Sequence, residues 1–504
     1  MARYKHTEAE KGQGLFLSVN LKEQLIPGTF EYMLDNLIGN KIDIKYFDKN
    51  YKNDKTGAKA IPPKVLIKLI IYGYSKGVKS SRGIEELCKN NIIAKALSED
   101  MEPHWTTIAN FISSNENGFK DIFIKVLTYC TELGLVGGKI FAIDGCRLPS
   151  NAAIDLTGTA EELGKRLNVY RRMAEKHIAK HKRKDSNGEI DEKSQRNYDK
   201  QQKKLNRQIE RITEFLGTME YKGSRRGKEM RSNVTDNESA LIWSSSGYIQ
   251  GYIGLAVSDK ENQVIVEAKA VGSANECEHL PEILDTTLSN MNTAGIQKPE
   301  NGKLKLLADS NYFSEVNLCA CQARGVEGIM PDSQYKRRLT VNNEKRFEAS
   351  DFIFHESVNY YECPNGKNLG FKGKSIMPGG VEGSVYQASI KDCRICPLIK
   401  KCLRTKKEIS KIDKGRKLLI SRSNETGSLC NMLRENMNNE EYQDQYAYRI
   451  QIIEPVFANI TYSKRLNRFS LRGKSKVNGQ WQLYCIMHNL GKCLNGYNKG
   501  KEIA

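Results

Sequence analysis

Residues 139–144 read Lys-Ile-Phe-Ala-Ile-Asp, a short apolar run that follows the turn residues Gly137-Gly138 and ends in a carboxylate. A run of this length, rich in Ile and Phe, is typical of a buried strand. A second run, Lys303-Leu-Lys-Leu-Leu-Ala-Asp309, ends in the same way. Because α/β proteins assemble their sites at the carboxyl ends of strands, we expect Asp144 and Asp309 to lie at one edge of a sheet.

The segments around these two runs predict a mixed α/β sheet. β-rich segments separated by turn residues occupy 241–244, 247–257 and 263–268. A helical pattern covers 278–290, and the second run is followed by a helix at 313–324 and a short strand at 326–330. Antiparallel strands followed by a strand–helix–strand alternation are typical of this fold class. We therefore place a catalytic domain at 136–330, completed by a helical segment at 440–490.

Three other regions flank or interrupt that domain. Residues 1–135 have helical patterns and predict an all-α N-terminal domain, either a helix-turn-helix DNA binder or an ordinary bundle. Residues 158–217 have two apolar stripes at helical spacing, which predicts an inserted antiparallel hairpin joined across 185–188. Residues 331–439 break the pattern with Gly, Pro and Cys, so we expect a loop-rich insertion without a core of its own.

The overall charge indicates a polyanionic partner. The chain has 504 residues, with 79 Lys and Arg against 60 Asp and Glu, and a net charge of +19. Such an excess usually goes with a polyanionic partner, because Lys and Arg on phosphates release condensed counterions. A soluble basic protein without such a partner, or a ribosome-associated protein, has the same composition. The apolar stretch at 65–74 is broken by Lys68 and is too short to cross a membrane. Thirteen cysteines spread through a long chain do not suit a secreted disulfide scaffold, so we expect a cytoplasmic protein.

The carboxylates predict metal-dependent chemistry. Glu454 lies among apolar residues in the helical pattern that begins at Glu440, and it is the third candidate beside Asp144 and Asp309. Three acids brought together repel one another unless a cation neutralises them. Two Mg²⁺ or Mn²⁺ ions on such oxygens suit phosphodiester cleavage. Taken alone, each Asp could instead cap a turn or pair with a Lys.

Several ordered motifs carry a resemblance to a known family. They are Gly14-Leu-Phe-Leu-Ser, Tyr72-Gly-Tyr-Ser-Lys-Gly, Ser80-Ser-Arg-Gly-Ile-Glu, Ala142-Ile-Asp-Gly-Cys-Arg-Leu-Pro-Ser-Asn-Ala, Thr235-Asp-Asn-Glu-Ser, Leu307-Ala-Asp-Ser-Asn-Tyr, Ile453-Glu-Pro-Val-Phe-Ala-Asn-Ile, Arg468-Phe-Ser-Leu-Arg-Gly and His488-Asn-Leu. Along nearly the whole chain the sequence resembles bacterial insertion-sequence DDE transposases of the insertion sequence 1182 group.

The resemblance implies an RNase H-like fold and a set of catalytic residues. It places Asp144 on the first strand, Asp309 on the fourth and Glu454 on a helix that follows an insertion. It also implies cleavage at the transposon ends and strand transfer into target DNA. The expected partner is double-stranded DNA, which includes the inverted-repeat ends of the transposon and the target DNA. The resemblance also implies that the chain acts as a homodimer or higher oligomer.

The resemblance also suggests basic and aromatic residues around the Glu-bearing helix. Tyr448 and Arg449 match the Tyr and Arg expected upstream of the Glu, although their spacing departs from the commonest pattern. Thr461 stands where a downstream Lys is usual, and Lys464 is a nearby base. Because guanidinium fits phosphate bidentately, the expected DNA contacts are Arg449, Lys464, Arg468 and Arg472. Each of these could instead form a surface salt bridge. Asp236 and Glu238 could lie near the site and support its ligands, but we favour the interpretation that they are surface turn acids.

A cysteine cluster predicts a structural metal. Cys363, the pair Cys393-Arg-Ile-Cys396, and Cys402 fall within one segment. Four thiolates suit tetrahedral Zn²⁺ and leave no open position for catalysis. Free thiols are the alternative.

Two other functions fit parts of the sequence. An RNase H-like nuclease or resolvase would cleave DNA without strand transfer, and an inactive remnant would bind DNA without chemistry. The long basic hairpin and separate N-terminal domain favour a transposase over the nuclease. Three intact acids argue against a remnant.

Overall fold

The computed structural model describes residues 18–51, 59–187, 191–218, 222–223, 229–244, 247–299, 302–335, 347–376, 382–403, 413–421 and 428–503. The chain divides into two compact units, one formed by residues 1–118 with 494–504 and the other by 119–493. Residues 14–17 of the first quoted motif, and Gly188 at the predicted hairpin turn, lie outside the described residues.

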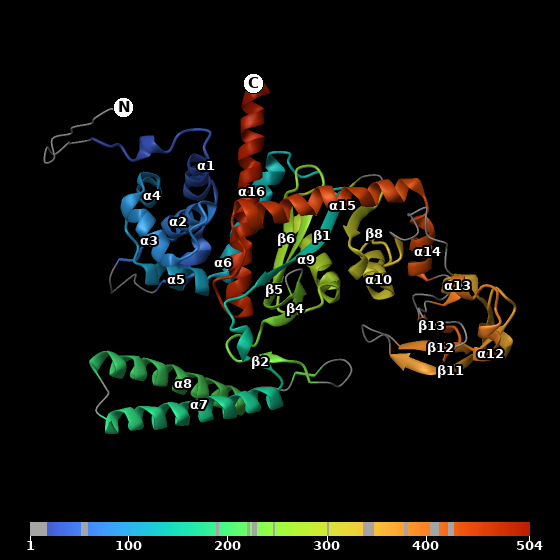
Figure 1. Cartoon of the computed structure of the whole chain (residues 1–504). Coiled ribbons are helices and arrows are strands. Elements are labelled where there is room, and N and C mark those ends of the chain that lie inside the picture. Colours follow the sequence, from blue (N-terminus) through green and yellow to red (C-terminus); the bar gives the residue numbers. More distant parts are fainter. Residues whose placement is uncertain are drawn as a thin grey trace, which may run out of the picture. The chain divides into compact units, whose positions relative to one another are not determined.

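The first unit is helical, as the sequence predicts (Figure 1). Pro63 stands in the first turn of α2, where the missing N–H costs nothing, and Ser80 caps α3 by accepting a hydrogen bond from the Gly83 N–H. Leu34, Ile70 and Ile84 are fully buried in its core. Its α-helices are α1 (Phe30–Asn36), α2 (Pro63–Ser75), α3 (Ser81–Asn90), α4 (Ile92–Ser98) and α5 (Trp105–Ser114).

A mixed sheet forms the centre of the second unit, which confirms the predicted α/β class. Its strands are β1 (Ile140–Pro149), β4 (Ala240–Ser244), β5 (Gly247–Asp259), β6 (Ile265–Val271), β7 (Leu304–Ala308) and β8 (Val326–Ile329). The order is β4-β5-β1-β7-β8, with β6 paired to β5. β1 runs antiparallel to β5 and parallel to β7, and β7 runs parallel to β8.

Helices cover this sheet. They are α6 (Glu116–Glu132), α9 (Leu280–Thr293), α10 (Glu315–Ala323), α15 (Glu440–Ala458) and α16 (Lys474–Ile503), of which α6 and α16 continue into the first unit. Trp481 of α16 is fully buried against Gly254, and its indole N–H donates to the Leu255 carbonyl at 2.9 Å. A Cβ on Gly254 would collide with that ring, so the glycine sets how closely α16 approaches the sheet.

The predicted helical hairpin is present as α7 (Ala160–Ser186) and α8 (Glu192–Thr218), which lie side by side (Figure 1). Thr159 and Glu162 form a capping box that starts α7. Leu163, Leu167 and Ile212 form the core between the two helices, as their spacing predicts. Short strands β2 (Thr157–Gly158) and β3 (Ser232–Asn233) pair at the base of the hairpin.

The expectation of a loop-rich insertion is wrong for residues 347–421. They form an antiparallel sheet in the order β13-β12-β11-β10-β9, with its own core around Leu369, Tyr386 and Leu418. These short strands contain aromatic and β-branched residues, which favour a half-buried sheet. The sheet therefore forms despite the Gly and Cys residues that flank the strands. The strands are β9 (Ile353–His355), β10 (Tyr360–Glu362), β11 (Asn368–Ile376), β12 (Glu382–Ala388) and β13 (Lys417–Ser421), and three helices follow or interleave, α12 (Ile390–Arg394), α13 (Ile399–Cys402) and α14 (Leu429–Asn436).

None of the described helices combines the length and apolar character that a membrane crossing requires.

Candidate active site

Two of the predicted carboxylates meet at one edge of the central sheet. Ile143 of β1 pairs with Ala308 of β7 in the parallel ladder. The residues that follow them, Asp144 within β1 and Asp309 just after β7, therefore stand at neighbouring positions. Adjacent strands lie about 4.8 Å apart, which brings the two side chains into electrostatic contact. Asp309 accordingly contributes to raising the pKa of Asp144. The predicted proximity of Asp144 and Asp309 is thus confirmed, but the expectation that the first strand ends at Asp144 is wrong, because β1 continues to Pro149 in its pairing with β5.

Asp144 is held by hydrogen bonds to both of its oxygens. Oδ1 accepts from the Gly145 N–H at 2.8 Å, and Oδ2 accepts from Arg449 Nη1 of α15 at 2.8 Å. Both side chains of this ion pair are largely buried. Burial raises the pKa of Asp144, and the Gly145 N–H and Arg449 partly offset that rise. A cation near this carboxylate therefore stabilises its charged form.

Asp309 stands at the start of the short 3₁₀ turn η6 (Ser310–Tyr312). Its Oδ1 accepts from the Asn311 N–H at 3.1 Å and from the Ser310 hydroxyl at 2.9 Å. The turn buries Tyr312 completely, and its hydroxyl has no hydrogen-bond partner among the described residues. Burial raises the pKa of Tyr312 well above its usual value, and the neighbouring carboxylates raise it further.

A third carboxylate, which the sequence does not predict, lies at this edge. Glu276 precedes the 3₁₀ turn η5 (Cys277–His279) that leads into α9, and only 5% of it is exposed. Burial raises its pKa to about 7, with Asp144 and Asp309 adding to the rise and Arg147 opposing it. No strand ending marks Glu276 in the sequence. The only local signal is its place between a strand and a helix.

The α15 residues behave differently from one another. Arg449 reaches Asp144, whereas the neighbouring Tyr448 lies under the Lys260 ammonium, 3.7 Å from its ring centre. Burial raises the pKa of Tyr446 and Asp309 adds to the rise, so on α15 it is Tyr446, and not Tyr448, that lies near this carboxylate. Glu454 is exposed and stands about 140° around the helix from Arg449. The structure thus groups Asp144 with Asp309 and leaves the Glu454 side chain on another face of α15.

The predicted DNA-contacting bases have contacts inside the chain. Arg449 is engaged with Asp144. Arg468 and Arg472 are exposed, but each donates through Nε to a backbone carbonyl just after β1, at Ser150 (2.9 Å) and Asn151 (2.6 Å) respectively. These two bonds fasten the 468–473 segment to the end of the strand that carries Asp144. The backbone N–H of Lys464 closes the turn that follows α15 by donating to Asn459.

The expectation that Asp236 is a surface turn acid is wrong. Asp236 is buried and accepts hydrogen bonds from the Tyr252 hydroxyl (2.9 Å) and the Gly473 N–H (3.2 Å). Glu238 accepts from the Lys474 N–H at 3.0 Å. Both acids therefore hold the start of α16.

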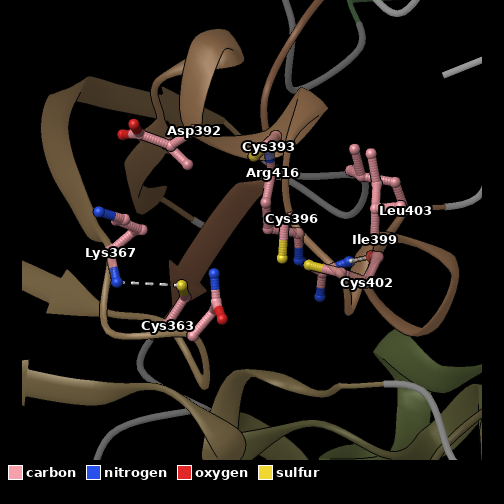
Figure 2. Close-up of a pocket in the computed structure, with 11 residues that line it drawn as sticks. Cys363, Lys367, Asp392, Cys393, Cys396, Ile399, Cys402, Leu403 and Arg416 are labelled. Carbon is pink, nitrogen blue, oxygen red and sulfur yellow. Dashed lines mark hydrogen bonds between the residues drawn. The ribbon is translucent and has the colours of Figure 1, made fainter.

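The four predicted cysteines line one cavity beside the second sheet. Figure 2 shows Cys363 on one side of the cavity and Cys396 and Cys402 on the other. Backbone N–H groups donate to two of the sulfurs, from Lys367 to Cys363 at 3.3 Å and from Arg416 to Cys393 at 3.4 Å. Burial raises the pKa of Cys393 and raises that of Cys402 to about 11, whereas the Arg416 N–H favours the Cys393 thiolate, the form that Zn²⁺ requires.

Both sites fit their metals by donor chemistry. The sheet edge offers carboxylate oxygens, which suit Mg²⁺ or Mn²⁺, and the cavity offers four sulfurs, which suit Zn²⁺. In the part of the chain that the structure describes, no three His, Cys, Asp or Glu side chains are already arranged closely enough to share an ion.

Comparison with known families adds independent evidence. Residues 362–494 match a family model described as "Transposase DDE domain", and residues 19–114 match one described as "Transposase domain (DUF772)". These matches support a DDE transposase family. A search of curated proteins gave no match. The match to the transposase DDE domain spans the four cysteines and α15 with Glu454, while Asp144 and Asp309 precede it in the chain. The match to the second transposase domain covers α1 to α5.

Proposed function

We propose that this chain is a DNA transposase that cleaves transposon ends and joins them to target DNA, in an RNase H-like domain of the insertion sequence 1182 type. The observation that carries the proposal is the pairing of Asp144 with Asp309 at one sheet edge, in a chain that matches two transposase domain families. The order β4-β5-β1-β7-β8, with antiparallel strands first and parallel strands after, supports the fold.

Asp144 and Asp309 would hold the divalent cations, Mg²⁺ or Mn²⁺. Glu454 remains a predicted ligand from the family resemblance, although its side chain is exposed on α15. Bound cations would supply positive charge beside the scissile phosphate, which favours attack by water and departure of the 3′ oxygen. Arg449 fixes the Asp144 carboxylate through its 2.8 Å hydrogen bond and keeps one of its oxygens oriented when no cation is present.

The reaction that fits this site has two displacements at phosphorus. Water attacks the phosphodiester at the transposon end, and the bond to the 3′ oxygen breaks, leaving a 3′-hydroxyl. That hydroxyl then attacks a phosphodiester of target DNA, loses its proton and displaces another 3′ oxygen. No covalent bond to the protein forms. The chain's own task is to align these groups.

The remainder of the molecule would bind the DNA. Transposon ends and target carry dense negative charge, and the chain carries +19. Arg468 and Arg472 are exposed next to the strand that bears Asp144, and we propose them, with Lys464, as phosphate contacts. Holding two transposon ends at once requires a second copy of the chain, so the active species would be a homodimer or larger oligomer.

We further propose that Cys363, Cys393, Cys396 and Cys402 bind one structural Zn²⁺. The common cavity and the N–H donors to two sulfurs support it. The purified chain should release about one zinc per molecule when its thiols are modified with a mercurial, detected with a chromogenic chelator. The Cys396→Ser variant should release less than half as much, whereas Cys319→Ser, an exposed cysteine outside the cavity, should match wild type. Zinc-free wild-type protein with normal thermal stability would contradict this proposal.

DNA joining tests the enzymatic proposal. Wild-type protein with a labelled transposon-end duplex and Mn²⁺ should yield cleaved and joined products, and EDTA should abolish both. Cleavage without joining would instead indicate an RNase H-like nuclease. DNA binding without any metal-dependent product would indicate an inactive remnant.

A further inference from the structure

We propose that Glu276 is a ligand of the divalent cation beside Asp144 and Asp309. The inference rests on the proposed function, because it names a residue of the same metal site. Glu276 lies between β6 and α9, so the three carboxylates come from different parts of the chain: Asp144 from within β1, Asp309 from just after β7, and Glu276 from the connection between β6 and α9. Its electrostatic influence reaches Tyr312, which is also affected by Asp144 and Asp309.

The burial of Glu276 is the first observation in support. Its Oε2 is inaccessible to solvent and has no hydrogen-bond partner among the described residues. Its other neighbours are Arg147, whose Nη2 lies 3.7 Å from Oε1, longer than a good hydrogen bond, and the Asn311 side chain, which hydrogen-bonds the carboxyl group and opposes the rise in its pKa. A buried, unpaired carboxylate oxygen is costly, and a cation that it coordinates is one of the few partners that removes the cost.

The space around Glu276 is the second observation. A Cβ added to Gly145 would collide with Glu276 Oε2, and also with the Ile253 side chain. The carboxylate therefore packs directly against the backbone next to Asp144, at a position where only glycine leaves room for it. Gly145 has no left-handed φ, so close approach is what requires glycine here.

Ligand chemistry is consistent with this placement. Asp144 gives one oxygen to Arg449, and Asp309 gives one to Asn311 and Ser310, so each has limited capacity left for a cation. Divalent hard cations take six or more oxygens. Glu276, whose Oε2 is unpaired, would supply an additional oxygen ligand for the cation.

The test measures Mn²⁺ affinity of the purified full-length chain without DNA, by isothermal titration and by the electron paramagnetic resonance signal of free Mn²⁺. Glu276→Gln keeps the shape and removes the charge, and we expect Mn²⁺ to bind at least tenfold more weakly. Glu278→Gln is the matched control, because Glu278 lies two residues away on the same turn and is exposed. Its affinity should stay within twofold of wild type.

Melting temperature in EDTA separates a ligand from a structural residue. If Glu276 is a ligand, Glu276→Gln in EDTA should melt at or above the wild-type temperature, because one buried repulsive charge is gone. Unchanged Mn²⁺ affinity would overturn the assignment. Weakened affinity together with a lowered melting temperature in EDTA would also overturn it, because that combination indicates a structural role. If Asp309→Asn loses Mn²⁺ binding while Glu276→Gln keeps it, the proposed metal site stands and only the inference fails. Absence of binding by wild type would contradict both.

Discussion

At the scale of single residues, the sheet depends on buried carboxyl groups outside the active site. Glu267 of β6 is buried, and its Oε2 accepts a hydrogen bond from Asn290 of α9. Burial raises its pKa to about 7, with Lys120 and Asn290 opposing the rise. Glu267 is therefore mostly protonated in the folded chain at mildly acidic pH and becomes charged near neutrality.

This raised pKa predicts a pH-dependent stability. Between pH 4.5 and 7 the unfolded chain binds fewer protons at this site than the folded chain, so stability falls as pH rises. The loss is complete above about pH 7 and amounts to at most about 3 kcal/mol. Glu267→Gln should flatten the fall in urea midpoint between pH 5 and 8, while exposed Glu278→Gln should keep it. An identical pH profile for wild type and Glu267→Gln would refute the assignment.

The crowding around Gly145 leads to a second prediction at the scale of single residues. Gly145→Ala should destabilise the chain by about 1–3 kcal/mol, because its Cβ meets the side chains of Glu276 and Ile253 in a packed region. Gly164→Ala, near the start of α7 with open space around it, should be neutral or stabilising. Thermal melts in EDTA measure both. Equal stability of the two variants would show that position 145 is not crowded.

At the scale of elements, periodicity and strand endings predicted much of the second unit. The first half of β1, the strand at 304–308 and the apolar stripes of α7 and α8 follow local patterns that the sequence shows directly. The continuation of β1 from Gly145 to Pro149 does not, because that part of the strand is defined by its pairing with β5. The sheet at 353–421 was missed, because its strands are short and interrupted, and its core forms only when distant segments pair. Glu276 was missed for a related reason. Its burial comes from tertiary packing against Gly145, which no local spacing reveals.

The packing of α16 against the sheet yields an element-scale prediction. Trp481→Ala should destabilise the second unit by about 3–5 kcal/mol, because it removes a fully buried ring and the bond to the Leu255 carbonyl. Trp243→Ala is the comparison, since Trp243 is 61% exposed on the edge strand β4, and it should cost far less. Urea unfolding followed by circular dichroism measures both. A small effect at Trp481 would mean that α16 contributes little to this core.

At the scale of the whole molecule, net charge and the two family matches point to the same partner. The excess of basic residues should make DNA binding strongly dependent on salt. If the chain neutralises six or more phosphates, affinity for a random duplex should fall roughly a thousandfold or more between 50 and 200 mM NaCl. Fluorescence anisotropy with a labelled duplex measures this. An affinity that does not change with salt would exclude a backbone-binding surface.

The most direct test of the central claim is strand joining by wild type and Asp309→Asn. Both proteins would be incubated with a labelled transposon-end duplex and a supercoiled target plasmid, in Mn²⁺ or in EDTA. We expect the wild-type protein with Mn²⁺ to insert the labelled end into the plasmid. We expect EDTA to reduce joining by at least a thousandfold. We expect the same reduction for Asp309→Asn, although this variant should still bind the duplex with wild-type affinity. Undiminished joining by Asp309→Asn would contradict the assignment of this sheet edge as the active site.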